Sequence, residues 1–246
     1  MYQTILMVWC VLGATMAQAV SIGWTNWNAL DVKSSTLSTG NKNTIHWVDT
    51  ANAQKFTSES NFAIKTTLTL KDNFAWNDSV HNTGLLLAVI AGDNRYAIQG
   101  ASTTLYDSVS GKKYENVVKE PGTVIAGGWV HGSDHAWQSA AHSEVVLEAE
   151  KSYTLMFTCE NKIFTAYVNS VPIGTFDSSR WGDVWALDEI TFGTDKDAAN
   201  LLDGVTTGYY EFSDFQYSMG SSAPEPTTLA LLALGVAGVV LRRRQA

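Results

Sequence analysis

The chain has 246 residues, 45% of them hydrophobic and 16% charged, so it has enough apolar residues to form a folded core and is not intrinsically disordered. Its 24 acidic side chains outnumber 16 Lys and Arg and give a formal net charge of -8, which argues against a nucleic-acid partner. Nine Trp, 19 Gly and only four Pro favour an exported all-β protein over a helical one.

The first 19 residues have the features of a signal peptide. An apolar run at residues 5–14 is followed by Ala-Gln-Ala at residues 17–19, the small-x-small pattern that signal peptidase accepts. The sequence therefore predicts a signal helix, cleavage before Val20 and export, although no Lys or Arg precedes the apolar run. Cleavage would remove Cys10 and leave Cys159 as the single thiol, which we expect to be a small buried residue within a strand.

Residues 20–219 show strand patterns and no sustained helical period, so we expect them to form one domain. At residues 62–70 apolar and polar side chains alternate, which is typical of a strand with one buried face. Residues 84–92 are apolar on both faces and lie between two glycines. This pattern favours a central strand over the alternative of a helix.

Strand patterns continue in the second half of the domain. Residues 153–159 and 163–169 are separated by three residues that include an Asn, so they are predicted to form a β-hairpin. Late strands are predicted at residues 190–193 and 209–217, with a polar surface loop at residues 194–207 between them. Short strands joined by turns predict an all-β fold, a two-sheet antiparallel β-sandwich.

One part of this series resembles a known family. A tyrosine strand at residues 153–157, an aromatic strand and turn at residues 163–174, and closing strands at residues 190–193 and 212–217 are similar to laminin-G and concanavalin-A-like jelly rolls. Ser170 stands where these domains usually have Gly. The resemblance implies a jelly-roll sandwich, in a family that often binds calcium.

Some concanavalin-A-like enzymes, the laminarinase-type glucanases, carry their catalytic carboxylates with the spacing Glu-x-Asp-x-x-Glu. This sequence does not contain that spacing. The nearest candidates are Glu144, Glu148 and Glu150, which one continuous strand would place on the same face, and Asp188 with Glu189. We favour solvated carboxylates on a sheet face over a catalytic group. The sequence therefore predicts no catalytic residue.

Two loops carry side chains that could hold a metal ion. The first is rich in His, and its candidates are His131, Asp134, His135 and His142. We favour solvated loop histidines there, because zinc needs three or four convergent ligands. The second has three carboxylates, Asp195, Asp197 and Asp203. Oxygen ligands suit calcium, but a plain surface loop is the favoured interpretation because the run lacks the Gly and Glu of an EF-hand loop.

Eight Trp follow the signal peptide, and most are expected to pack in the sandwich core. Four of them lie among Gly, Ser, Asp and His, where an exposed indole could stack on a sugar ring: Trp129, Trp137, Trp181 and Trp185.

The C-terminal segment has three parts in order. After a linker at residues 220–223 come Pro-Glu-Pro, an apolar stretch at residues 227–241, and three arginines. As a helix the stretch would span about 22 Å, short of a hydrocarbon core of about 30 Å. One interpretation is a short membrane anchor with its arginines on the cytoplasmic side.

These three parts also resemble the PEP-CTERM sorting signal of bacteria at residues 224–246. The residues that carry the resemblance are Pro224, Glu225, Pro226, Arg242, Arg243 and Arg244. The resemblance implies transient membrane insertion through a short C-terminal helix and cleavage near the Pro-Glu-Pro by an exosortase.

The sequence thus predicts an exported protein of the cell surface or extracellular matrix, processed by signal peptidase and an exosortase-type enzyme. Its sandwich is expected to be a non-catalytic module that binds an exopolysaccharide or another glycan. One alternative is a structural envelope or matrix protein with protein–protein contacts only. A further alternative is glycan cleavage by Glu144, Glu148 or Glu150.

Overall fold

The structure is a computed structural model, and it describes part of the chain. The described residues are 24–36, 44–76, 83–101, 103, 105–106, 113–114, 118–130, 138–193 and 206–220. Within these ranges the side chains are described except at residues 36, 83, 105–106, 113–114, 129, 138–143 and 206–207. The predicted signal helix and C-terminal helix therefore lie outside the described residues.

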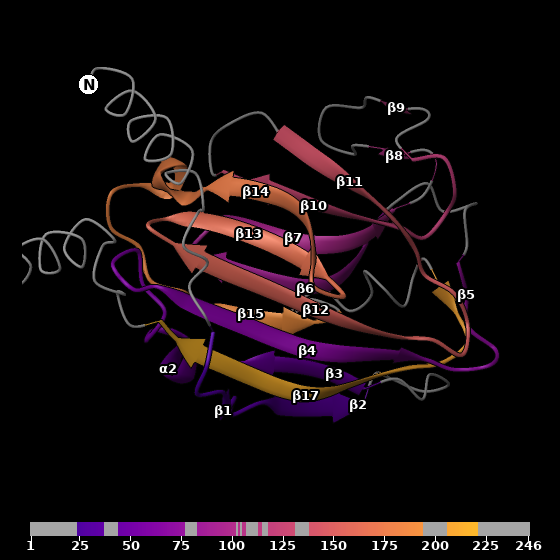
Figure 1. Cartoon of the computed structure of the whole chain (residues 1–246), viewed down its shortest axis with the longest axis horizontal. Coiled ribbons are helices and arrows are strands. Elements are labelled where there is room, and N and C mark those ends of the chain that lie inside the picture. Colours follow the sequence, from indigo (N-terminus) through magenta and orange to yellow (C-terminus); the bar gives the residue numbers. More distant parts are fainter. Residues whose placement is uncertain are drawn as a thin grey trace, which may run out of the picture. The chain divides into compact units, whose positions relative to one another are not determined.

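Six antiparallel strands form the first sheet (Figure 1). In spatial order they are β1 (Asn28–Ala29), β17 (Tyr210–Met219), β4 (Phe62–Leu70), β12 (Ser152–Glu160), β13 (Ile163–Val168) and β14 (Val171–Asp177). The last long strand, β17, thus lies between the first strand and the centre of the sheet. A register shift between Ser213 and Gln216 marks a bulge in β17, where Asp214 has a φ of 54°.

Seven strands form the second sheet, which packs against the first (Figure 1). In spatial order they are β11 (Gln138–Val146), β10 (Thr123–Trp129), β7 (Asn94–Ala101), β6 (Thr83–Ala91), β15 (Glu189–Phe192), β3 (Thr44–Val48) and β2 (Lys33–Thr36). The other elements are short: α2 (Thr50–Ala53), η2 (Ser178–Trp181), and the two-stranded pairs β5 (Ala75–Trp76) with β16 (Thr206–Thr207) and β8 (Leu105–Tyr106) with β9 (Lys113–Tyr114).

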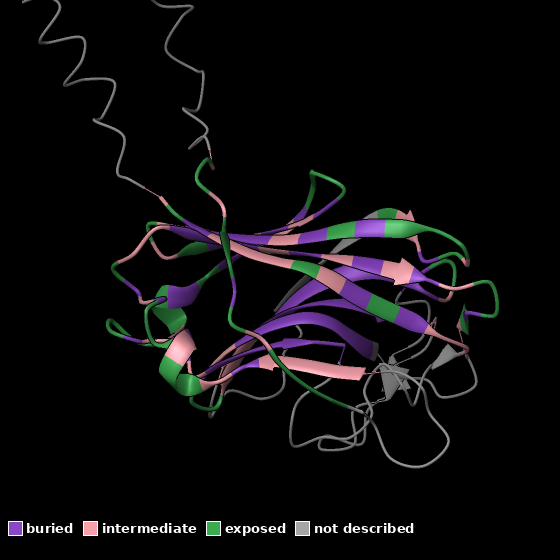
Figure 2. Cartoon of the chain, turned by 90° about the horizontal axis from the view of Figure 1, so that it is seen from below, coloured by how far each residue is buried: buried purple, intermediate pink, exposed green. Residues whose placement is uncertain are grey.

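The main core lies between the two sheets, where buried residues of both are found (Figure 2). Along β4 every second side chain, from Phe62 to Leu70, points into this core, as the alternating pattern predicts. The centre is aromatic: the ring of Tyr96 lies 5.0 Å from that of Phe157 and 5.7 Å from that of Phe164. Aromatic side chains bury large areas, so this cluster contributes much of the hydrophobic stabilisation.

The predicted fold class is confirmed: the chain is an antiparallel two-sheet β-sandwich. Residues 62–70 form β4, the hairpin is β12–β13, and residues 84–92 lie mainly in β6, in the middle of its sheet. The predicted loop at residues 194–207 is wrong at its end, because Thr206 pairs with Trp76 in β16–β5. The closer assignment to laminin-G-like jelly rolls stays a prediction.

Cys159 is fully buried on β12, as predicted, and its burial raises the pKa of the thiol to about 12. Within the part of the chain that the structure describes, no helix has the length and apolar character needed to cross a bilayer.

Candidate functional site

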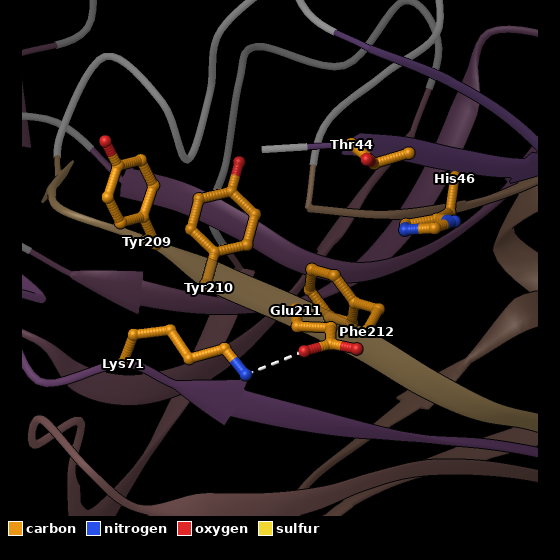
Figure 3. A pocket seen from close by; sticks show the side chains of 7 residues that line it. All are labelled: Thr44, His46, Lys71, Tyr209, Tyr210, Glu211 and Phe212. Atoms are coloured by element: carbon orange, nitrogen blue, oxygen red, sulfur yellow. Dashed lines mark hydrogen bonds and ion pairs between the residues drawn. The ribbon is translucent and has the colours of Figure 1, made fainter. Parts of the chain in front are cut away.

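A pocket of about 340 Å³ lies between the two sheets, where β17 of one faces β3 of the other (Figure 3). Its lining combines aromatic, charged and hydroxyl-bearing side chains: Thr44, His46, Lys71, Tyr209, Tyr210, Glu211 and Phe212. The volume is at the lower end of the range of about 300–1,000 Å³ that is usual for sites that bind small molecules.

The charged part of the pocket is set by the pairing of β17 with β4. Tyr210 is the register partner of Leu70, and the backbone amide of Lys71 donates a hydrogen bond to the carbonyl of Tyr209, at 2.9 Å. This register brings the Lys71 ammonium to 2.7 Å from a carboxylate oxygen of Glu211 (Figure 3). Both side chains are largely exposed, so the ion pair stabilises the fold little and is accessible to a ligand.

The apolar part of the pocket follows from the alternation of side chains along β17. Tyr210 and Phe212 point into the sandwich and are 6% and 4% exposed, whereas Glu211 between them is exposed at the mouth of the pocket. Tyr209 precedes the strand and is half-buried at the rim. In Figure 3 the hydroxyls of both tyrosines point away from the Lys71–Glu211 pair. The pocket therefore offers an aromatic side and a charged side.

Tyr209 is positioned by the residue before it. Gly208 has a φ of +84°, and a Cβ built there would overlap the backbone carbonyl of Asn73. The side-chain oxygen of Asn73 accepts a hydrogen bond from the backbone amide of Tyr209, at 3.1 Å. Glycine thus allows the close approach that fixes the start of β17.

His46 comes from β3 and lies half-buried in the wall of the pocket. Its ring centroid is 5.0 Å from that of Phe215 and 6.3 Å from that of Phe212. Burial lowers the pKa of His46, and the Glu211 carboxylate acts in the opposite direction more weakly. The imidazole is therefore neutral near pH 7, with Nδ1 2.7 Å from the hydroxyl oxygen of Ser34.

The carboxylates considered for catalysis are not arranged as one strand would place them. β11 ends at Val146, so only Glu144 lies within it, and the expected shared face is wrong. Glu148 lies beyond the strand and pairs with Lys151 at 2.8 Å, and Glu150 has a φ of 60°. A turn rather than a continued strand thus follows Val146.

The other two candidate carboxylates, Asp188 and Glu189, lie just before and at the start of β15. Asp188 accepts a hydrogen bond from the backbone amide of Gly92, at 2.5 Å, and Glu189 is 5% exposed within β15. Neither lines the pocket.

The structure does not test the predicted metal sites. Asp195, Asp197 and Asp203 lie outside the described residues, as do His131, Asp134 and His135, and for His142 in β11 only the backbone is described. Within the described part of the chain, no three His, Cys, Asp or Glu side chains lie together as metal ligands would. The surface loop favoured from the sequence, and calcium as its alternative, both stay predictions.

Of the four Trp considered for glycan stacking, two have described side chains. Trp185 is 7% exposed, its ring stacked on that of Phe164 at 5.6 Å, so it is a core residue. Trp181 is half-buried in η2, with its ring 5.4 Å from that of Trp185. Trp137 lies outside the described residues, and the side chain of Trp129 is not described. For these last three, stacking stays a prediction.

The pocket was not foreseen from the sequence. Its residues come from three separate segments, 44–46, 71 and 209–212, and only the strand at residues 209–217 was predicted. The available signal in the sequence was the pair of tyrosines followed by a glutamate at the start of that strand.

One protein-family motif matches the C-terminal end of the chain. The PEP-CTERM protein-sorting motif matches residues 222–244 and confirms the resemblance noted for Pro224, Glu225, Pro226 and the arginines. The motif implies a protein that is exported, associated with the membrane at its C-terminal end before processing, and sorted by an exosortase. No curated protein sequence matches the chain.

Several solved structures resemble the sandwich at low identity. The binding domain of Paraclostridial Mosquitocidal Protein 1 is 12% identical with a TM-score of 0.42, over 81% of this chain and 45% of that chain. The carbohydrate binding module CBM66 from Bacillus subtilis is 11% identical with a TM-score of 0.37, over 80% of this chain and 97% of that one.

Trypanosoma rangeli sialidase is 12% identical with a TM-score of 0.43, over 78% of this chain and 26% of the sialidase. The chain thus spans less than half of the toxin domain and of the sialidase. Because all three TM-scores are below 0.5, no property of these proteins is transferred to this chain.

Proposed function

We propose that this chain is a protein of the cell surface or extracellular matrix whose β-sandwich binds a polysaccharide, with the pocket between β3 and β17 as the binding site. The PEP-CTERM motif supports export and sorting by an exosortase. The observation that carries the binding role is the lining of the pocket, which combines the half-buried ring of Tyr209 with the exposed Lys71–Glu211 pair.

A sugar ring matches these groups in its chemistry. Its C–H faces pack on an aromatic ring, and its hydroxyls both donate and accept hydrogen bonds, so they can bond to an ammonium and to a carboxylate. The hydroxyl of Thr44 adds a further donor and acceptor on the β3 side. A polysaccharide can therefore place one sugar unit in the pocket.

The same lining favours binding over cleavage. Glycoside hydrolysis by the usual mechanisms needs two carboxyl groups about 5–9.5 Å apart, one on each side of the scissile bond. Among the described residues of the pocket, Glu211 supplies the single carboxylate, and it is paired with Lys71. We therefore propose a non-catalytic module.

The experiment is a pull-down of the full-length chain in detergent with insoluble polysaccharides, the exopolysaccharide of its native host among them. We expect Tyr209→Ala to weaken binding by about tenfold or more, which corresponds to about 1.4 kcal/mol. Tyr167→Ala is the matched control, because Tyr167 is a half-buried tyrosine of the same sheet that does not line the pocket. Unchanged melting temperatures would show that both variants are folded.

Three results would contradict the proposal. If no polysaccharide binds, the chain is better explained as a structural protein with protein–protein contacts only. If both tyrosine variants lose binding equally, the site is not this pocket. Release of reducing ends from a bound glycan would instead favour the enzymatic alternative.

A further inference from the structure

The six-stranded sheet has one end from which the sorting tail continues. β17 ends at Met219, and the backbone amide of Gly220 donates a hydrogen bond to the carbonyl of Asn61, at 2.8 Å. Asn61 lies just before β4, and its side-chain oxygen accepts from the amide of Asn161 in the β12–β13 turn, at 2.9 Å. Gly220, Asn61 and this turn therefore share one end of the sheet, which we call the tail end.

Exposed apolar side chains gather at the tail end. Four large hydrophobic residues are exposed among the described residues, and three of them are here: Ile163 at 39%, Met219 at 42% and Val184 at 78%. Ile163 starts β13 opposite Glu160, and Met219 is the register partner of Phe62. The Lys162 ammonium donates to the carbonyl of Asp183, at 2.7 Å, and so holds Val184 beside the same turn.

Trp24 belongs to the same end. The hydroxyl of Ser218 donates to the carbonyl of Thr25, at 2.7 Å, which ties this segment to β17. A Cβ built on Gly220 would lie 3.0 Å from the indole of Trp24, so the ring packs directly on the last described residue. Trp24 itself is half-buried and adds aromatic surface to the tail end.

The length of the chain after Gly220 limits how far the tail end can be from a membrane. The apolar stretch of the sorting signal starts at Thr227, seven residues later. Fully extended, this connection spans at most about 25 Å. While the stretch is inserted in the bilayer, the tail end is therefore held close to the lipid surface.

We propose that the tail end, formed by Trp24, Ile163, Val184 and Met219, rests in the headgroup region of the bilayer while the sorting tail is inserted. This inference rests on the proposed sorting of the chain by way of its membrane tail. Trp favours the interface between lipid and water, and exposed apolar side chains lose their contact with water there. The opposite end of the sheet, with Lys71 and the pocket, would face away from the membrane.

The experiment uses the full-length chain reconstituted in vesicles of phosphatidylethanolamine and phosphatidylglycerol. An environment-sensitive fluorophore is attached at Val184→Cys, and as a matched control at Asp72→Cys, an exposed position beside Lys71. Both are made with Cys10→Ser, since Cys159 is buried. We expect a blue-shifted emission and quenching by headgroup-labelled lipid for the label at Val184, and neither for the label at Asp72.

Carbonate-resistant flotation with the vesicles reports tail insertion separately when it is compared with the same chain shortened at residue 223, because both chains contain the apolar run at residues 5–14. If the chain floats and the label at Val184 is as exposed to water as the label at Asp72, the proposed lipid contact is refuted, whereas insertion of the tail in the membrane is supported. If the chain does not float, both the proposed sorting and the contact fail. A blue shift of the label at Val184 that grows with protein concentration in detergent, without vesicles, would show that a second copy covers the tail end and would also refute the proposal.

Discussion

His46 is the side chain of the pocket that could gain a proton just below pH 7. It lies half-buried against Phe212 and Phe215, and burial lowers its pKa in the folded protein. In the unfolded chain a histidine titrates near about 6.5. As the pH falls below that value, the unfolded chain takes up a proton that the folded state still excludes, so stability falls.

We therefore expect the free energy of unfolding to decrease between pH 7 and the lowered pKa of His46, and to decrease less in His46→Gln. Urea denaturation at a series of pH values measures both slopes. Parallel slopes for the wild-type protein and His46→Gln would contradict the assigned shift.

Among the elements, the start of β17 depends on a glycine. Gly208 combines a φ of +84° with a backbone carbonyl of Asn73 in the space that a Cβ would occupy. We expect Gly208→Ala to lower the free energy of unfolding by more than about 2 kcal/mol, because the left-handed conformation and the backbone clash both add to the cost. Chemical denaturation measures the change.

Gly92→Ala is the matched control for this substitution. Gly92 also has a positive φ, +57°, but nothing lies within 4 Å of the position of its Cβ. Gly92→Ala should therefore lower the free energy of unfolding only by the cost of the left-handed conformation, about 1–2 kcal/mol. Equal losses for the two variants would mean that the Asn73 contact does not constrain β17.

Individual strands were predictable because their signal is local. The alternation of residues 62–70 needs only one buried face, and the short Asn-containing gap at residues 160–162 needs only a tight turn; Asn161 and Lys162 indeed have φ values of 51° and 66°. The pocket was not predictable, because Thr44 and Tyr209 are far apart in sequence and meet only through the packing of the two sheets. The order in which strands pair within the two sheets leaves no pattern in a short stretch of sequence.

The same lack of a local signal explains why Glu144, Glu148 and Glu150 were wrongly expected to share one strand face. The spacing of Glu144, Glu148 and Glu150 defines one face only if the strand continues, and nothing in their spacing shows where it stops. β11 stops at Val146, and the next residue, Leu147, is buried, with its amide bonded to the carbonyl of Gly122. Tertiary contacts of the apolar residues thus decided the position of the turn.

At the scale of the whole molecule, the first and last described segments are joined. β1 pairs with β17, and Trp24 packs on Gly220, so the chain enters and leaves the sandwich at neighbouring points. Removal of the signal peptide and of the sorting tail would therefore both take place outside the paired strands. We expect processing at either end to leave the two sheets and the pocket intact.

The last prediction is that the tail is removed rather than kept as an anchor. The apolar stretch, about 22 Å long as a helix, is short for a bilayer core of about 30 Å. Pro224 and Pro226 disfavour a helix around Glu225, so we expect an extended segment there that an enzyme could reach. Mass spectrometry of the protein from its native host should find a C-terminus near Pro226 and no peptide from residues 229–246. The same host without its exosortase is the control and should yield the intact tail. Recovery of the three arginines in the mature protein of the unmodified host would instead support a permanent anchor.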